Sequence, residues 1–339
     1  MLIEKNKNIL FLNTFNISVH AAYYTHFSSL KELDEILHTS TYKEAKNHII
    51  IGGGSNVLFT TDFNGIILHN KIKGIELIAE TAAQVFVEVG AGEIWHDFVQ
   101  YCINKNWYGI ENLSLIPGTV GAAPIQNIGG YGVELKHICY TVTGYDTIEK
   151  KIITFSNAQC DFGYRDSIFK KQYRDNFIIT KVCFVLSKKK VFNLSYHGIQ
   201  TALQQQNIEN PSLQDISNII ISLRNAKLPN PAKIGNAGSF FKNPIINLTE
   251  LENVCKKIPT IQTFPINENT CKIPAAALIE YCGWKGYKNS KVGCYEKQAL
   301  VLVNVGNASG QDVLALATKI QESVFANVGI QLETEVRII

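Results

Sequence analysis

The 339-residue chain lacks the features that mark several large classes of protein. No apolar stretch approaches the roughly 20 residues that a membrane-spanning helix needs. The N-terminus, MLIEKNKNILFLNTFNISV, carries Glu, Lys and Asn where a secretory signal would be apolar. The eight cysteines form no C-x-x-C pair and show no regular spacing, which argues against a zinc site or a disulfide framework. We therefore expect a cytoplasmic protein with reduced thiols, without a metal and without membrane insertion.

Clustered charge is also missing. The net charge is only +3, and the one basic run, residues 188–190, has no aromatic residues interleaved with it, so nucleic acid is not an expected partner. The chain has no internal repeat and no low-complexity segment. A hydrophobic content of 46% and a charged content of 18% are typical of a globular protein, and the length favours two or three domains.

Apolar spacing predicts helices alternating with strands. A helix begins behind a Ser29/Glu32 capping box, and an Asn64-Gly65 turn precedes a strand at 66–68. A later helix lies between a Ser309/Asp312 cap and Gly329. The remaining predicted elements are strands at 48–51, 83–92, 140–146, 150–156, 177–186 and 297–304, and helices at 94–102, from 213, and from Pro274 to Gly283. The proline-rich segment 228–244 is the best domain boundary.

The C-terminal residues 330–338 alternate strictly. Residues 330, 332, 334, 336 and 338 share one face, and Glu333, Glu335 and Arg337 share the other with Gln331. The pattern predicts a strand whose charged face needs partners.

A glycine loop, IGGGSNVLF at 51–59, lies between two predicted strands. A dinucleotide fingerprint would need glycine at Val57 and a helix after it, and a P-loop would need a lysine that is absent. Either an anion-binding nest of backbone N–H groups or a structural tight turn remains open. A second loop, SLIPGTVGAAPIQNIGGYGVE at 114–134, also removes side chains, with five glycines and two prolines. Two such loops suggest one large ligand, such as a diphosphate flanked by ring systems.

These loops, together with FGYRDSIFK, GNAGSFFKNP and the terminal LETEVR, closely resemble the UDP-N-acetylenolpyruvoylglucosamine reductases, flavoenzymes of bacterial peptidoglycan synthesis. The resemblance runs from about Asn13 to the C-terminus. It implies an α+β protein with a PCMH-type FAD-binding fold, of the vanillyl-alcohol oxidase group, over 13–187. Its two α/β subdomains would cover about 1–72 and 73–225. A lid loop at about 188–212 would belong to the second subdomain, and a substrate-binding α+β domain at 226–339 would return its C-terminal strand to the active site.

The resemblance also implies non-covalent FAD, NADPH as reductant, and a role in cell-wall formation and through it in cell shape and division. Because this family does not attach its flavin, His48 and His69 are expected to be core or surface residues. We expect a monomer that binds only small molecules. The cofactor-binding residues implied are Gly52, Gly53, Gly54, Ser55, Asn56, Pro117, Gly118, Thr119, Gly121, Ala122, Gln126, Asn127 and Arg337.

Reduction of an enolpyruvyl ether delivers a hydride to its terminal carbon and pushes charge into the carboxylate, so an enolate-like dianion must be stabilised. The family's arginine, which suits a carboxylate because of its planar fork, falls on Arg165. The family's proton-donating serine falls on Ser239, and its glutamate falls on Glu335. Without the family, Arg165 reads as a surface ion pair with Asp161 or Asp166, Ser239 as a turn residue, and Glu335 as part of an ion-paired edge.

Further residues match substrate-facing positions of the family: Tyr131, Tyr164, Tyr196, Lys227, Asn243 and Gln298. Lys227 suits a phosphate, although a lysine at a helix end is equally ordinary. Glu335 lies close to the end of the chain, which leaves its positioning open. Two rival functions stay open at this point: an oxygen-using oxidase on the same scaffold, and a catalytically silent flavin- or nucleotide-sugar-binding module.

Overall fold

A computed structural model describes residues 2–339. The chain forms two compact units that exchange short segments. The first contains the chain up to Lys7, Ala21–Gly53 and Asn64–Arg224, and the second contains Asn8–His20, Gly54–Phe63 and Asn225–Ile339. The glycine loop therefore passes from one unit to the other between Gly53 and Gly54. The domain limits expected from the sequence stay a prediction.

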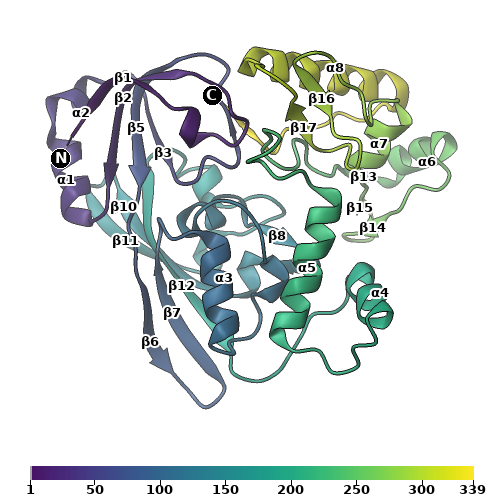
Figure 1. Cartoon of the computed structure of the whole chain (residues 1–339), viewed down its shortest axis with the longest axis horizontal. Coiled ribbons are helices and arrows are strands. Elements are labelled where there is room, and N and C mark those ends of the chain that lie inside the picture. Colours follow the sequence, from purple (N-terminus) through teal and green to yellow (C-terminus); the bar gives the residue numbers. More distant parts are fainter. Residues whose placement is uncertain (1) are drawn as a thin grey trace. The chain divides into compact units, whose positions relative to one another are not determined.

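The first unit holds two sheets (Figure 1). The four-stranded sheet has the order β1 (Glu4–Asn8), β2 (His20–Phe27), β5 (Phe63–Asn70), β3 (His48–Ile51). Helices α1 (Leu30–His38) and α2 (Ser40–Glu44) follow β2, and buried Leu33 and Ile36 of α1 pack on the sheet. Ser29 caps α1 by accepting a hydrogen bond from the Glu32 backbone N–H, as the sequence predicted.

The second sheet of this unit is antiparallel throughout. Its order is β11 (Lys151–Ser156), β10 (Cys139–Asp146), β12 (Phe177–Ser187), β7 (Gln84–Gly90), β6 (Ile75–Glu80). Helix α3 (Trp95–Asn104) buries Trp95 and Phe98 against Phe184 of β12. Helices α4 (His197–Gln205) and α5 (Leu213–Lys227) share a smaller core around Ile199.

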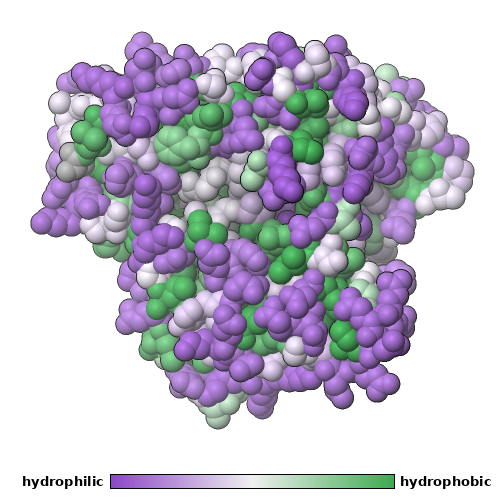
Figure 2. Space-filling model, in the orientation of Figure 1, coloured by the Kyte–Doolittle hydropathy of each residue, from purple (hydrophilic) through white to green (hydrophobic). Residues whose placement is uncertain are grey.

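The second unit contains β4 (Val57–Leu58), β13 (Ile245–Asn247), α6 (Leu248–Lys257), β14 (Phe264–Pro265), β15 (Thr270–Lys272), α7 (Ala275–Tyr281), β16 (Val292–Cys294), β17 (Leu302–Asn304), α8 (Gly310–Val328) and β18 (Arg337–Ile338). Ser309 and Asp312 form the predicted capping box of α8, and Gly329 ends it in a left-handed conformation. The α+β class expected from the sequence is confirmed. On the face shown in Figure 2, hydrophilic residues predominate and hydrophobic ones occur in small groups.

Four local predictions were wrong or incomplete. Asn64 and Gly65 lie inside β5, because β5 begins at Phe63 and pairs with β2 and β3, whereas β4, the strand before it in the sequence, pairs with β18. Segment 188–212 contains α4, and only Leu302–Asn304 of the strand predicted at 297–304 forms. The C-terminal segment is not one continuous strand: only Arg337–Ile338 is regular, although Ile330, Leu332 and Val336 are buried as the alternation predicted.

Candidate functional site

The two glycine-rich loops meet although they are more than sixty residues apart in the sequence. A Cβ built on Gly53 would lie 3.1 Å from the Cα of Gly118, and one built on Gly52 would lie 2.0 Å from Oγ1 of Thr119. A side chain at either position would press on the opposite loop, so glycine suits this close approach. Gly52, Gly53, Gly118 and Thr119 thus form one backbone surface in the first unit.

Gly54 has a different reason to be glycine. Its φ is +61°, and a Cβ on it would lie 1.9 Å from the carbonyl oxygen of Leu12. Both the backbone conformation and the packing exclude a side chain there. Gly54, Ser55 and Asn56 belong to the second unit, and Gly52 and Gly53 belong to the first.

The second loop is docked on the turn that precedes α3. The carbonyl of Gly118 accepts from Trp95 N (3.0 Å), Val120 N donates to the carbonyl of Glu93 (2.9 Å), and Gly121 N donates to the carbonyl of Ala91 (2.8 Å). A Cβ on Gly121 would lie 2.5 Å from the Cβ of Ala91. These contacts fix the loop without using the side chains predicted to face a ligand. Such a rigid loop can present its backbone to a ligand without losing much conformational entropy on binding.

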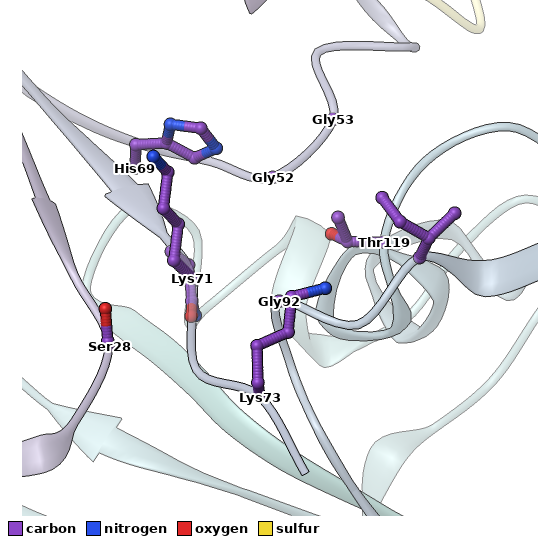
Figure 3. A pocket seen from close by; sticks show the side chains of 10 residues that line it. Ser28, Gly52, Gly53, His69, Lys71, Lys73, Gly92 and Thr119 are labelled. Atoms are coloured by element: carbon purple, nitrogen blue, oxygen red, sulfur yellow. The ribbon is translucent and has the colours of Figure 1, made fainter. Parts of the chain in front are cut away.

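A pocket with a volume of about 420 Å³ opens beside these loops (Figure 3). Thr119 lies near Gly52 and Gly53, and the Lys71 side chain extends beside the His69 ring. Burial, followed by the charges of Lys71 and His26, lowers the pKa of His69 to about 4, so this ring is neutral at pH 7. The full lining is Ser28, Gly52, Gly53, His69, Asn70, Lys71, Lys73, Gly92, Ile94 and Thr119.

The charged residues of this pocket, Lys71 and Lys73, were not predicted from the sequence. Lys71 and Lys73 follow β5, and the Lys73 ammonium pairs with the Glu93 carboxylate at 3.2 Å. Neither lysine belongs to a recognisable motif, and only their position at the strand end in three dimensions brings them to the glycine loop. Two cations beside these glycine-rich loops favour an anionic ligand such as a diphosphate.

Asn127 is occupied by the fold itself. It is fully buried in a left-handed conformation, and its amide donates to Oε2 of Glu134 and to the carbonyl of Gly163, both at 2.9 Å. Its Oδ1 accepts from Lys136 N at 3.0 Å. Both amide hydrogens of Asn127 are therefore engaged, and the side chain braces the loop against the segment that carries Arg165.

Two predicted site residues occupy strained backbone at hairpin tips. Tyr131 (φ +52°) and Gly132 (φ +85°) form the tip between β8 (Gly129–Gly130) and β9 (Val133–Glu134). Arg165 (φ +53°) lies in the turn closed by hydrogen bonds between Gly163 and Asp166. Twelve non-glycine residues within 2–339 have positive φ, and the four that are not Asn or Asp are Leu115, Tyr131, Lys150 and Arg165. Such outliers collect at functional sites, because the surrounding fold must hold them.

The two hairpin tips are in contact. Nη2 of Arg165 donates to the carbonyl of Gly129 (3.2 Å), and the guanidinium lies 5.5 Å from the ring centroid of Tyr164. The two acidic neighbours considered in the sequence bind another cation: Asp161 and Asp166 both pair with the Lys171 ammonium, at 3.7 and 2.6 Å. Lys171 is therefore an ion-pair partner of both acidic residues that the sequence places near Arg165.

A second guanidinium faces the same hairpin and was not predicted. Nη1 of Arg224, on α5, lies 3.8 Å from the position of a Cβ on Gly130, and its Nε is buried without a hydrogen bond. Burial lowers the pKa of Arg224, the neighbouring Tyr131 raises it, and the charge of Arg165 lowers it. A half-buried cation beside a like charge is unfavourable unless an anion joins them. No sequence motif marked Arg224.

Tyr131 and Tyr196 form an aromatic pair beside these arginines. Their ring centroids are 4.9 Å apart in an edge-to-face arrangement. Burial raises the pKa of Tyr131 to about 12, while Arg224 lowers it. The Tyr131 phenol is therefore a neutral hydrogen-bond donor at pH 7.

In the second unit, Ser239 and Glu335 lie on neighbouring backbone segments. Phe240 N donates to the carbonyl of Leu300 (2.7 Å), and the carbonyl of Phe240 accepts from Glu335 N (2.8 Å). The turn before Ser239 depends on Asn236, which is buried and accepts from Gly238 N at 2.9 Å, with Gly238 at φ +70°. The segment that carries Ser239 is thus paired directly with the one that carries Glu335.

Hydrogen bonds fix the C-terminal segment as far as Ile339. Arg337 N donates to the carbonyl of Asn56 (3.0 Å), Asn56 Nδ2 donates to the carbonyl of Glu335 (3.2 Å), and β18 pairs with β4 in parallel. Ile339 N donates to the carbonyl of Leu58 at 2.9 Å. The proximity of Glu335 to the terminus therefore does not leave its backbone loose.

The remaining predicted substrate residues also lie in the second unit. Asn243 Oδ1 accepts from Ala275 N at the start of α7 (3.0 Å), and Gln298 Oε1 accepts from Leu300 N (3.3 Å). Lys227 is exposed at the end of α5. Tyr131, Tyr164, Tyr196 and Arg165 belong to the first unit.

Comparison with known proteins identifies the family. The model of the UDP-N-acetylenolpyruvoylglucosamine reductase C-terminal domain matches residues 230–339, and the model of an FAD-binding domain matches residues 21–151. A UDP-N-acetylenolpyruvoylglucosamine reductase of Flavobacterium johnsoniae is 44% identical over 342 residues, covering 100% of both chains. The chain belongs to this reductase family. The reductase of Amoebophilus asiaticus is 45% identical over 339 residues, again with 100% of both chains covered.

A solved structure shows the same fold. The crystal structure of the reductase from Thermus caldophilus has a TM-score of 0.69 and 20% identity, and the match covers 100% of this chain and 99% of that one. The family resemblance, the FAD-binding fold and the reductase activity expected from the sequence are thereby confirmed. As a member of the family, the chain is an FAD-dependent oxidoreductase of peptidoglycan synthesis, a UDP-N-acetylmuramate dehydrogenase that uses NADPH.

Proposed function

We propose that this chain reduces enolpyruvyl-UDP-N-acetylglucosamine to UDP-N-acetylmuramate with Arg165, Ser239 and Glu335 in the catalytic roles. The observation that carries the proposal is the close contact of the Gly52–Gly53 and Gly118–Thr119 backbones beside a pocket that holds two lysines. That cradle fits FAD, because its glycines bring two backbone segments together beside the pocket and because its cations suit a diphosphate. Gly52, Gly53, Thr119, Lys71 and Lys73 would hold the cofactor.

Bound FAD, once reduced by NADPH, supplies the hydride that the vinyl carbon of the substrate accepts. Arg165 would then face the carboxylate on which negative charge develops, and Arg224 adds a second cation beside the same hairpin. Guanidinium groups suit this charge because they stay protonated and donate in a fixed fork. Partial burial and the charge of Arg165 both disfavour the Arg224 cation, and an anion bound by both guanidinium groups would offset that cost.

Ser239 and Glu335 would act on the same carboxyl-bearing group. Ser239 Oγ would donate its hydrogen to the carbon next to the carboxylate, and Glu335 would hydrogen-bond that carboxylate as a neutral acid. Direct pairing of the Phe240 and Glu335 backbones keeps the two side chains on neighbouring segments. The residues that would contact the substrate are Tyr131, Tyr164, Tyr196, Lys227, Asn243 and Gln298. The role of each remains a proposal.

Two kinds of feature are absent from the part of the chain that the structure describes. No helix within residues 2–339 is both long enough and apolar enough to cross a bilayer. No group of three or more His, Cys, Asp or Glu side chains able to hold a metal ion occurs among those residues. We propose that the enzyme acts in the cytoplasm as a monomer that binds only its sugar nucleotide, NADPH and FAD.

A half-reaction experiment tests the catalytic assignment. Ser239→Ala should leave reduction of the flavin by NADPH intact and slow its reoxidation by the enolpyruvyl substrate by about 100-fold or more. Ser290→Ala, at an exposed serine of the same unit, is the matched control and should change neither half. Equal slowing of both half-reactions by Ser239→Ala would contradict the role of proton donor. Rapid reoxidation by oxygen alone would favour the oxidase alternative, and absence of flavin would favour the binding module.

A further inference from the structure

Asn112 makes contacts that link two segments of the proposed substrate site. It lies in the 3-10 turn Glu111–Leu113 and is buried, with 1% of its surface exposed. Its Nδ2 donates to the backbone carbonyl of Tyr131 at 2.8 Å and to that of Asn193 at 2.9 Å. The two acceptors fix the orientation of the amide, because only the NH₂ group can donate to both.

Asn193 and Ser195 complete the connection from the other side. Asn193 Nδ2 donates to the carbonyl of Gly132 at 3.0 Å, and Asn193 Oδ1 accepts from both N and Oγ of Ser195. Gly132 permits this approach, because a Cβ on it would lie 2.8 Å from Oγ of Ser195. We call Asn112, Asn193 and Ser195 the polar clasp.

The polar clasp encloses the aromatic pair. Tyr131 is one of its acceptors and is held in a left-handed conformation that a tyrosine rarely adopts. Tyr196 follows Ser195 directly, at the start of α4, and its ring packs edge-to-face on that of Tyr131. Opening the clasp would release both the strained turn and the segment that carries Tyr196.

We propose that Asn112 is a positioning residue that assembles the Tyr131–Tyr196 pair before substrate binds. The inference rests on the proposed function insofar as these tyrosines face the substrate. A preassembled pair lowers the entropy that binding must overcome, so the effect belongs to affinity more than to turnover. The buried Oδ1 of Asn112 has no hydrogen-bond partner, an unfavourable feature that the two donated bonds offset.

Asn112→Leu removes both donors at nearly constant shape and without adding charge. Asn157→Leu is the matched control, because Asn157 Nδ2 also bridges two backbone carbonyls, those of Lys136 (2.8 Å) and Cys139 (2.7 Å), but shares no residue with the clasp. Asn193→Ala removes the hydrogen bonds of the half-buried Asn193 side chain to Gly132 and Ser195. This second variant keeps the proposal testable even if Asn112→Leu fails to fold.

Amide hydrogen exchange of the substrate-free flavoprotein is the first measurement. Asn112→Leu and Asn193→Ala should accelerate exchange in 193–200 about tenfold, which corresponds to about 1.4 kcal/mol, whereas Asn157→Leu should not. The second measurement is steady-state kinetics with the enolpyruvyl sugar nucleotide, where KM should rise about tenfold and kcat should stay within about threefold. Together these outcomes support the proposal.

Unchanged exchange in 193–200, unchanged KM, or equal effects from Asn157→Leu would each overturn it. A fall in kcat with constant KM would also overturn it, because it would place Asn112 in the chemical step. The exchange measurement needs no substrate. Failure of the proposed function would instead appear as a wild-type flavoprotein that does not turn over this substrate at all.

Discussion

Replacement of Gly52 by alanine tests the contact between the two glycine-rich loops. The new Cβ would lie 2.0 Å from Oγ1 of Thr119, about 1.4 Å closer than ordinary van der Waals contact at 3.4 Å. Rotation of the Thr119 side chain can move the hydroxyl, but the Cβ of Thr119 would remain at 3.2 Å, which is still tighter than ordinary contact. Thr119 is buried, so the loops must separate. Overpacking of this kind costs about 1–3 kcal/mol, which predicts a roughly five- to 150-fold weaker affinity for FAD.

The assay is titration of flavin-free protein with FAD, followed by quenching of the flavin fluorescence. Gly306→Ala is the control, because its nearest neighbour would be a carbonyl oxygen 3.8 Å away. A double-mutant cycle with Thr119→Ala sharpens the test. If the clash causes the loss, the double variant should recover about 1 kcal/mol relative to the sum of the single effects. Unchanged affinity in Gly52→Ala, or strictly additive losses, would refute the reasoning.

Two further predictions concern charge. Arg165→Lys keeps the positive charge but loses the planar fork, so reoxidation of the reduced flavin by substrate should slow about 100-fold while reduction by NADPH stays unchanged, as stopped-flow absorbance would measure. His69 is neutral in the folded protein down to about pH 4, whereas an unfolded histidine gains its proton near pH 6.5, so stability should fall as the pH drops through that window. Urea denaturation of the flavin-free protein should show a loss of at most about 3 kcal/mol between pH 6.5 and 4, and a smaller loss in His69→Gln.

Local sequence signals determined much of this fold, because they act over a few residues. The capping serines Ser29 and Ser309 mark their helix starts, and Gly329 marks the end of α8. The alternation near the C-terminus correctly predicted which residues are buried, although not that Arg337–Ile338 would be the only regular strand there. The turn predicted at Asn64-Gly65 failed because the pairing of β5 with β2 and β3 is a non-local fact.

The residue types of the site could also be predicted from the sequence, since motifs such as GNAGSFF and IGGGSNVLF combine glycine with polar side chains in a recognisable order. Family resemblance supplied the cofactor and the reaction, and the comparisons confirm both. The residue roles that it implied for Arg165, Ser239 and Glu335 remain proposals.

Only the tertiary structure brings Gly53 against Gly118, Lys71 to the pocket and Arg224 to the hairpin of Tyr131. It also shows that the side-chain amides of Asn127 and Asn112 donate hydrogen bonds within the protein. The sequence alone does not tell such an asparagine from one that faces a ligand. The physical reason is common to all of these cases. Periodicity and capping depend on interactions between residues that are close in the sequence. Burial, unpaired charge and close backbone approach depend instead on residues that folding brings together from distant positions.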